Sequence, residues 1–248
     1  MSLQQVLLHF GNLPKNLNGD SENTMKTEKQ TYDKDALNDL RDLFGGIQSK
    51  YLFILGKWLI RCHQNIVITG KKGCGKKKLL NAIYLEALSE IKAYPNSNVR
   101  LCIVDSVDDI KGTSILLGCI RPDKNEMFIF THSATTPKAF LKLLNWKIGL
   151  AYGKIFPRNY TDVILQLVKF EIHIDIVGNS RLISRVNEYI LNDDGVIESI
   201  ELAHFNTETS TYDILSIPSD EVLSSMALTL SESDAQDMYS DFLQFCNK

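Results

Sequence analysis

The sequence predicts an α/β fold in which a mostly parallel sheet is flanked by helices. Short apolar runs typical of buried strands occupy residues 66–68, 99–105, 127–130 and 170–177. Segments with the apolar spacing of amphipathic helices separate most of these runs, and this alternation favours parallel strands covered on both faces. The chain has 248 residues, of which 44% are hydrophobic, so it can bury one sizeable core.

A glycine-rich loop follows the first predicted strand. Gly70, Gly75 and Lys76 lie at the G-x-x-x-x-G-K spacing, and a helical pattern begins at about residue 77. Strand, glycine loop, lysine and helix form the architecture of a phosphate-binding P-loop, in which backbone N–H groups and the helix dipole face one anion. The predicted nucleotide-binding residues are Gly70, Lys71, Lys72, Gly73, Cys74, Gly75, Lys76 and Lys77. The alternative is a glycine turn that binds nothing.

The residue after Lys76 departs from the strict motif. That position requires Ser or Thr, whose hydroxyl holds Mg²⁺, but here it is Lys77. An ammonium group cannot ligate a metal ion and would repel one. We therefore expect the loop to suit the phosphates of ATP or ADP and to hold Mg²⁺ poorly.

Acidic and histidine residues end two of the predicted strands. Asp105, Asp108 and Asp109 could hold Mg²⁺ if a nucleotide binds, because hard oxygen ligands suit this ion. Alternatively, they form a carboxylate-rich helix start, which the helix dipole favours. His132 could replace a missing base at the carboxyl edge of the sheet, the alternative being a loop histidine without a catalytic role.

Charge and cysteine content exclude several classes of protein. The formal net charge is −3, so no global basic field indicates a nucleic-acid-binding protein. A local basic cluster surrounds the loop and consists of Lys71, Lys72, Lys76, Lys77 and Lys78. The five cysteines form no C-x-x-C pair, which indicates a reduced, cytoplasmic protein without a zinc site or a disulfide framework. We expect Cys102 and Cys119 in the core, and Cys74 exposed beside positive charge.

The start of the chain and its apolar runs give no targeting signal. No apolar run approaches about 20 residues, so we expect no membrane span. Residues 1–10 lack the features of a secretory signal. The division we predict is an N-terminal arm and polar linker at 1–34, a P-loop domain at 35–210 and a C-terminal helical extension at 211–248.

Further elements follow from periodicity and turn signals. We expect a helix at 35–44 and a second one capped by Ser49, with Leu52, Phe53, Leu55, Leu59 and Ile60 buried. The predicted helices after the loop lie at 77–92, 136–146, 160–169, 220–230 and 234–245. The other strand-like runs lie at 115–120, 149–156, 181–191 and 196–205, the last two joined by a hairpin turn at 192–195.

Several single side chains allow two interpretations. Trp58 and Trp146 lie on apolar helix faces and are expected in the core, and His173 is expected on the exposed side of its strand. Arg158, Arg181 and Arg185 could act as sensor or inter-subunit arginines, or form ordinary surface salt bridges.

The order of these pieces resembles the hexameric traffic ATPases of type IV secretion, conjugation and pilus assembly. The resemblance covers about residues 35–205. It rests on the helix–glycine–helix entry at 40–70, on Leu-Leu-Asn-Ala at 79–82, on the acidic stretch at 99–110 and on Arg-Pro-Asp at 121–123 before the strand at 127–130. It implies a RecA-like P-loop fold, an oligomeric state and protein partners in a multi-subunit machine.

The chain also departs from that family. The strand at 127–130 continues as Thr131-His132 where the family has Gly-Glu, whose Glu activates water, and residues 145–150 contain no histidine. Because the Mg²⁺ hydroxyl is also absent, most of the apparatus for attack on a γ-phosphate is missing. We therefore expect a degenerate, weakly or non-hydrolysing subunit in the cytoplasm, associated with the inner face of a membrane machine. The alternatives are an active ATPase with a rearranged site, and a P-loop subunit of a DNA replication or recombination complex.

Overall fold

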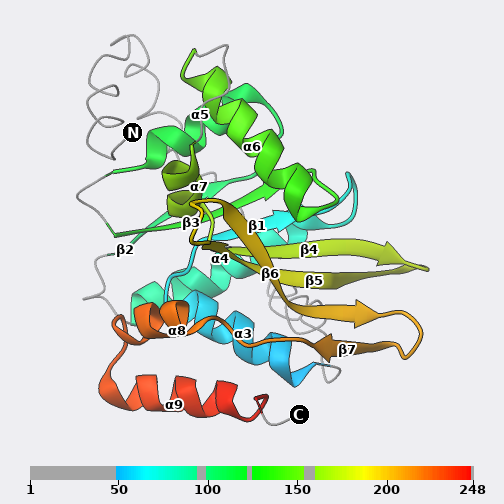
Figure 1. Cartoon of the computed structure of the whole chain (residues 1–248), viewed down its shortest axis with the longest axis vertical. Helices are drawn as coiled ribbons and strands as arrows, with labels where there is room; N and C mark the ends of the chain where they lie inside the picture. Colours follow the sequence, from blue (N-terminus) through cyan, green and yellow to red (C-terminus); the bar gives the residue numbers. More distant parts are fainter. Residues whose placement is uncertain (1–48, 94–98, 122–124, 154–159, 247–248) are drawn as a thin grey trace.

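A computed structural model describes residues 49–93, 99–121, 125–153 and 160–246 (Figure 1). In these ranges a seven-stranded sheet has the order β2-β3-β1-β4-β5-β6-β7. Its strands are β1 Ile66–Thr69, β2 Val99–Val104, β3 Asn125–His132, β4 Phe170–Val177, β5 Ser180–Leu191, β6 Ile197–Asn206 and β7 Thr211–Ile214. The α/β class is confirmed.

The sheet is mixed, whereas the sequence predicted a mostly parallel one. Strands β2, β3, β1 and β4 are parallel neighbours, but β4, β5, β6 and β7 pair antiparallel. The reason is the length of the connections, since a short turn can only return the chain antiparallel, and a parallel return needs a crossover. Only two residues, with Gly178 at φ +61°, separate β4 from β5.

Most of the predicted helices are confirmed. The helices of the described part are α3 Lys50–Arg61, α4 Lys76–Ala93, α5 Ile110–Cys119, α6 Pro137–Ala151, α7 Thr161–Leu167, α8 Asp220–Ala227 and α9 Glu232–Leu243. Ser49 caps α3 as expected, because its Oγ accepts the N–H of Leu52 at 3.2 Å. Thr136 caps α6 in the same way, with Pro137 in the first turn.

Two strand predictions are wrong, and one strand was not predicted. The apolar run at 115–120 belongs almost entirely to α5, which begins where Asp109 caps it. A short apolar run does not by itself distinguish a strand from a buried helix. Residues 149–151 continue α6 rather than starting a strand. Strand β7 lies at the start of the segment 211–248, for which only helices were expected.

Other predictions concern residues outside the described ranges. These are the N-terminal arm and linker at 1–34, the helix at 35–44, and parts of the connections at 94–98, 122–124 and 154–159.

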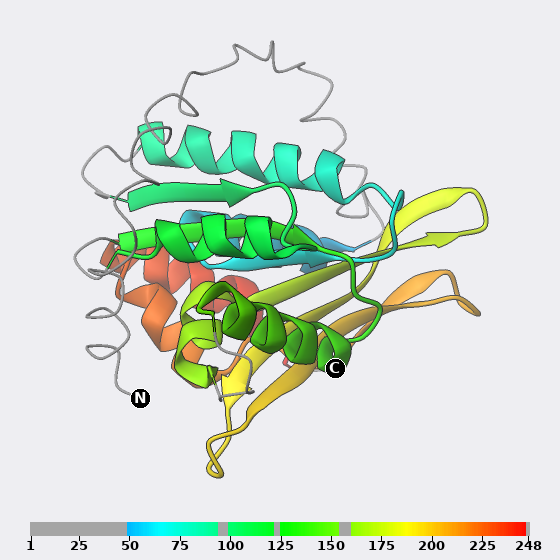
Figure 2. The same ribbon diagram turned by 90° about the horizontal axis from the view of Figure 1, so that it is seen from above.

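Helices cover both faces of the sheet. Figures 1 and 2 show α5, α6 and α7 on one side of the sheet and α3, α4, α8 and α9 on the other. Alternate residues of β1 divide between the two faces, so Ile66 and Ile68 join the larger cluster and Val67 the smaller one. The C-terminal helices add Met226, Met238 and others to the larger cluster, so they share the core of the sheet.

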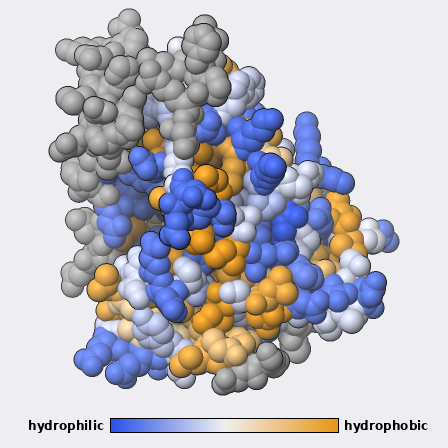
Figure 3. Space-filling view, in the orientation of Figure 1, coloured by the Kyte–Doolittle hydropathy of each residue, from blue (hydrophilic) through white to orange (hydrophobic). Residues whose placement is uncertain are grey.

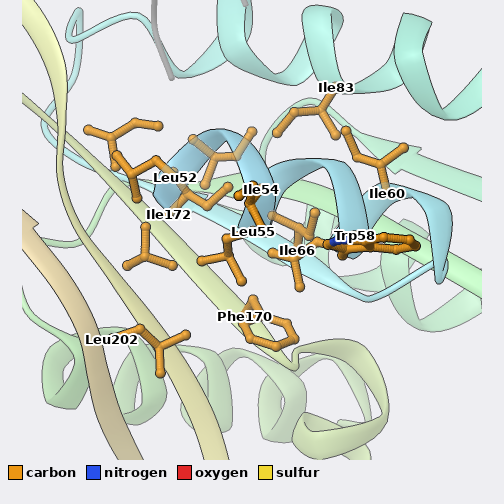
Figure 4. Packing of buried hydrophobic residues seen from close by; sticks show 14 of the residues in the cluster. Leu52, Ile54, Leu55, Trp58, Ile60, Ile66, Ile83, Phe170, Ile172 and Leu202 are labelled. Carbon is orange, nitrogen blue, oxygen red and sulfur yellow. The ribbon is translucent and has the colours of Figure 1, made fainter. Parts of the chain in front are cut away.

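Helix α3 forms the centre of the larger cluster. Figure 4 shows Leu55 and Trp58 of α3 beside Ile66 of β1 and Phe170 of β4, and Trp58 is fully buried as predicted. Phe53 is 53% exposed, because it lies on the side of α3 away from the sheet, so its predicted burial is wrong.

Trp146 is also exposed, at 56%, contrary to prediction. Its neighbours on α6 that enter the core are Leu144 and Lys147–Ile148, which leaves the indole on the outer side of the helix. Apolar and polar side chains are interspersed on the face shown in Figure 3. Among the described helices, none has the length and hydropathy needed to cross a lipid bilayer.

Candidate functional site

The glycine loop lies at the carboxyl edge of the parallel strands. It connects the end of β1 at Thr69 to the start of α4 at Lys76. In the parallel register Thr69 pairs with His132, the last residue of β3, and with His173 in the middle of β4, so three polar residues lie side by side where β1 ends. This edge is where ligands bind in open α/β sheets.

The backbone of the loop requires its glycines. Gly70, Gly73 and Gly75 have φ values of +138°, +85° and +106°, which side chains rarely adopt. A Cβ atom at Gly70 would lie 2.3 Å from the carbonyl oxygen of Ile174. A Cβ atom at Gly73 would meet nothing within 4 Å, so the outer side of the loop is open. The predicted strand–glycine loop–helix unit is therefore present in the structure.

Lys76 folds back over the loop. Its Nζ donates to the carbonyl oxygens of Gly70 at 2.8 Å and Lys71 at 2.9 Å, and to Ser133 Oγ at 3.3 Å. A lysine in the first turn of the helix is thereby held within reach of both the loop and the end of β3. A phosphate in the loop would compete with these neutral acceptors for the ammonium group.

Lys77 pairs with the first carboxylate of the acidic stretch. Its Nζ lies 2.8 Å from Oδ2 of Asp105, and the two side chains are 68% and 57% exposed. The hydrogen bond to Asp105 raises the pKa of Lys77 above its usual value, so the group carries a full charge. An ammonium therefore stands beside the carboxylate, at the motif position whose hydroxyl would hold Mg²⁺.

The other two carboxylates have separate roles. Asp109 caps α5 by accepting the N–H of Gly112 at 2.7 Å. This agrees with the alternative prediction that the acidic stretch forms the start of a helix. Asp108 accepts the N–H and hydroxyl of Ser133 at 2.5 and 2.7 Å. Partial burial opposes ionisation of Asp108, but the Ser133 hydrogen bonds outweigh it and lower its pKa. Within the described ranges no three His, Cys, Asp or Glu side chains gather as a metal site.

Cys74 is buried, and the prediction of an exposed thiol is wrong. Its side chain is 1% exposed and belongs to the larger hydrophobic cluster. The reason is the close approach of the loop to β4, since Sγ fills the space that a Cβ atom of Gly70 would need, 2.7 Å away. Cys74 therefore supports the loop from inside. Cys102 is buried as expected, whereas Cys119 is only partly buried.

A polar network that the sequence did not indicate extends from the loop into the smaller core. His132 is 1% exposed, and its Nε2 lies 2.8 Å from Nζ of Lys147, a lysine that is 6% exposed. Lys147 also donates to the carbonyl of Val107 at 3.0 Å. Burial and the charge of Lys147 lower the pKa of His132 to about 4. His132 is therefore a neutral, buried residue at the end of β3 and not a loop histidine.

A second network lies beneath Thr69. Glu171 is fully buried, and its carboxylate accepts hydrogen bonds from Thr69 at 2.5 Å, Asn187 at 2.9 Å and Tyr189 at 2.7 Å. Burial opposes ionisation of Glu171, but hydrogen bonds from neighbours that include His173 lower its pKa. The predicted exposure of His173 is wrong, because the ring is 1% exposed and lies 2.6 Å from Thr69 Oγ1. Alternation along one strand cannot reveal that both of its faces are covered.

Two of the three arginines lie close to the loop or to the end of β3. A Cβ atom at Gly75 would lie 3.2 Å from Cδ of Arg181, so this side chain from β5 borders the loop. Arg185 donates to the carbonyl oxygen of Thr135 at 2.7 Å. Arg158 lies outside the described residues.

Comparison with known families finds no family model that matches this chain, and comparison with curated proteins finds no similar sequence. The resemblance to traffic ATPases therefore remains an expectation from the motifs.

Proposed function

We propose that this chain is a phosphate-binding pseudo-ATPase, which holds the phosphates of ATP or ADP at residues 70–77 with little or no turnover. The observation that carries the proposal is the conformation of the loop with Lys76 folded onto it. Three glycines with positive φ join a buried strand to a helix, and the lysine ammonium lies against carbonyls that a phosphate can replace.

The charges at the start of α4 support an anionic ligand. Lys76, Lys77 and Lys78 occupy the first turn, which contains no acidic residue. Cations at a helix N-terminus are unfavourable by a few tenths to about 1 kcal/mol each, because they oppose the helix dipole. A bound polyphosphate would offset this unfavourable interaction between the lysines and the helix dipole. The three lysines therefore support a phosphate-binding role for the loop.

The surroundings of the loop argue against efficient hydrolysis. Glu171, the buried carboxylate on the strand beside β1, already accepts three hydrogen bonds and is fully buried. It is therefore not available to orient a water molecule. His132 is engaged by Lys147 and does not reach solvent either. This favours the pseudo-enzyme over the alternative of an active ATPase with a rearranged site.

We extend the proposal to the setting that the motif resemblance implies. The chain would be a subunit of a bacterial secretion, conjugation or pilus-assembly machine, in a homo- or hetero-oligomer that acts through protein partners. A particle-mass measurement on the complex purified from its native source tests this part by itself.

Substitution of Lys76 tests the binding role. Lys76→Ala should weaken binding of a fluorescent ATP analogue at least about tenfold, because the lysine supplies a charge-assisted contact to the phosphates. Lys92→Ala, at the far end of the same helix, is the matched control and should change the dissociation constant by less than about twofold. Phosphate release by the unmodified protein should stay at the level of Lys76→Ala. Turnover that Lys76→Ala abolishes would contradict the pseudo-enzyme.

The lysine cluster supports a second candidate function, which is DNA binding by a replication or recombination subunit. Lys71, Lys72 and Lys78 are all exposed, so they are free to contact a phosphate backbone. Steeply salt-dependent DNA binding that is lost when these three lysines are neutralised would favour a replication or recombination subunit.

A further inference from the structure

Lys77 stands at the motif position whose hydroxyl holds the metal ion in P-loop proteins, and it is paired with Asp105. In such proteins a hydroxyl of the residue after the P-loop lysine and a carboxylate from a neighbouring strand share Mg²⁺. Here Lys77 takes the position of the hydroxyl, and its Nζ lies 2.8 Å from Oδ2 of Asp105, which follows β2. The position after the P-loop lysine thus carries a cation that is paired with a carboxylate, in place of a metal-binding hydroxyl.

We propose that the Lys77 ammonium takes the place of the divalent cation, so that the loop binds nucleoside di- and triphosphates in their metal-free form. This rests on the proposed function and adds the chemical form of the ligand. In the absence of ligand the ammonium is balanced by Asp105, and in its presence it turns to the outer phosphates.

Because Lys77 and Asp105 are exposed, little free energy is needed for the ammonium to leave the carboxylate and contact a phosphate. Both side chains are more than half exposed, and such surface pairs contribute little to stability. A phosphate chain carries several charges, so it competes well for an ammonium that is held so weakly. A divalent ion faces the opposite situation, because it would have to displace Lys77 from Asp105 and then remain close to its charge.

The other charged groups around the loop also favour binding of a metal-free polyphosphate. Lys71, Lys72 and Lys78 are exposed on the loop and the first turn, and Arg181 borders Gly75. The other two carboxylates of the acidic stretch, Asp108 and Asp109, are bonded to Ser133 and to the start of α5. These cations would supply the neutralisation that Mg²⁺ normally gives a polyphosphate.

Calorimetric titration with ADP and with inorganic tripolyphosphate, in EDTA and in excess Mg²⁺, tests the proposal. For the unmodified protein, the dissociation constant in EDTA should equal that in Mg²⁺ within about twofold, or be the lower of the two. Lys77→Thr restores the metal-binding hydroxyl, and its binding should become at least about tenfold weaker in EDTA than in Mg²⁺. Lys78→Thr removes the adjacent charge, and its loss of affinity should be the same in both buffers. Asp105→Asn releases Lys77 and should strengthen binding in EDTA about two- to fivefold.

The outcomes separate this inference from the proposed function. If Mg²⁺ strengthens binding by the unmodified protein tenfold or more, the phosphate site stands. The proposal that the Lys77 ammonium replaces the divalent cation is then wrong. The same holds if Lys77→Thr is no more sensitive to EDTA than Lys78→Thr. The absence of binding in both buffers would instead overturn the phosphate site itself. Thermal unfolding of each variant establishes that it is folded before the titrations are compared.

Discussion

At the scale of single residues, the molecule buries several ionisable groups close to the candidate site. His132 and Lys147 form a contact of 2.8 Å inside the smaller cluster, and Nδ1 of His132 lies 3.9 Å from Oδ1 of Asp108. Burial also lowers the pKa of Lys147. Because His132 resists protonation in the folded chain, acid should destabilise this region.

The pH dependence of stability tests this. His132 has a pKa of about 4 in the folded protein, whereas an unfolded histidine titrates near 6.5. The unfolded chain takes up the proton first, so stability that is present above about pH 6.5 is lost as the pH falls towards 4, by on the order of 3 kcal/mol. Urea unfolding between about pH 7 and pH 4.5 should therefore show a shallower decline for His132→Gln than for the unmodified protein. The partly exposed His204→Gln is the control and should keep the original slope. Equal slopes for all three proteins would contradict the assignment.

At the scale of elements, a buried carboxylate connects the sheet to the C-terminal helices. Glu188 of β5 is fully buried and accepts the N–H of Ser219 at 2.8 Å and its hydroxyl at 2.5 Å. Ser219 is also the N-cap of α8, where its Oγ faces the N–H of Val222 at 3.4 Å. One serine thus begins the helix and attaches it to the sheet. Ser231 caps α9 at 3.2 Å without a buried partner.

Alanine at these two caps should have unequal effects. Ser231→Ala removes an exposed cap and should lower the free energy of unfolding by about 1 kcal/mol. Ser219→Ala also removes a hydrogen bond to a buried carboxylate, so it should cost about 2–4 kcal/mol. Urea unfolding of both variants measures the difference. If the two losses are equal, Glu188 does not hold α8 to the sheet.

At the scale of the whole molecule, the sheet has a parallel half and an antiparallel half that meet at β4. Strand β1 is buried along its full length, and it pairs with β3 on one side and β4 on the other. Strand β7 is a four-residue edge strand whose residues are exposed or partly exposed. The loop at 70–75 therefore emerges from the most enclosed strand of the molecule.

Hydrogen exchange should follow this arrangement. Amides of β1 and of the adjoining part of β4 should exchange only through global unfolding, because both clusters cover them. Amides of β7 should exchange at least about a hundredfold faster, through local opening of the edge. Mass spectrometry of peptides that cover 66–69 and 211–214 makes the comparison. Equal protection of the two strands would mean that the edge opens only together with the core.

The sequence by itself determined the backbone of the candidate site. The β-branched run at 66–68, the spacing of Gly70, Gly73 and Gly75, and the helical pattern after Lys76 are local features, and the structure contains the strand, loop and helix that they predict. The cap at Ser49 and the later hairpin of β5 and β6 were predictable for the same reason. In each case neighbouring residues decide the outcome through φ preferences and apolar periodicity.

Only the tertiary structure decided which side chains meet around that backbone. Thr69 and Glu171 are 102 positions apart, and Lys77 and Asp105 are 28 apart, yet each pair is in contact. The burial of Cys74 and His173 and the exposure of Phe53 and Trp146 likewise depend on which elements lie on each face. Such contacts follow from strand order and from the connections that reverse the chain. A local pattern contains neither, because it describes one segment and not its neighbours in space.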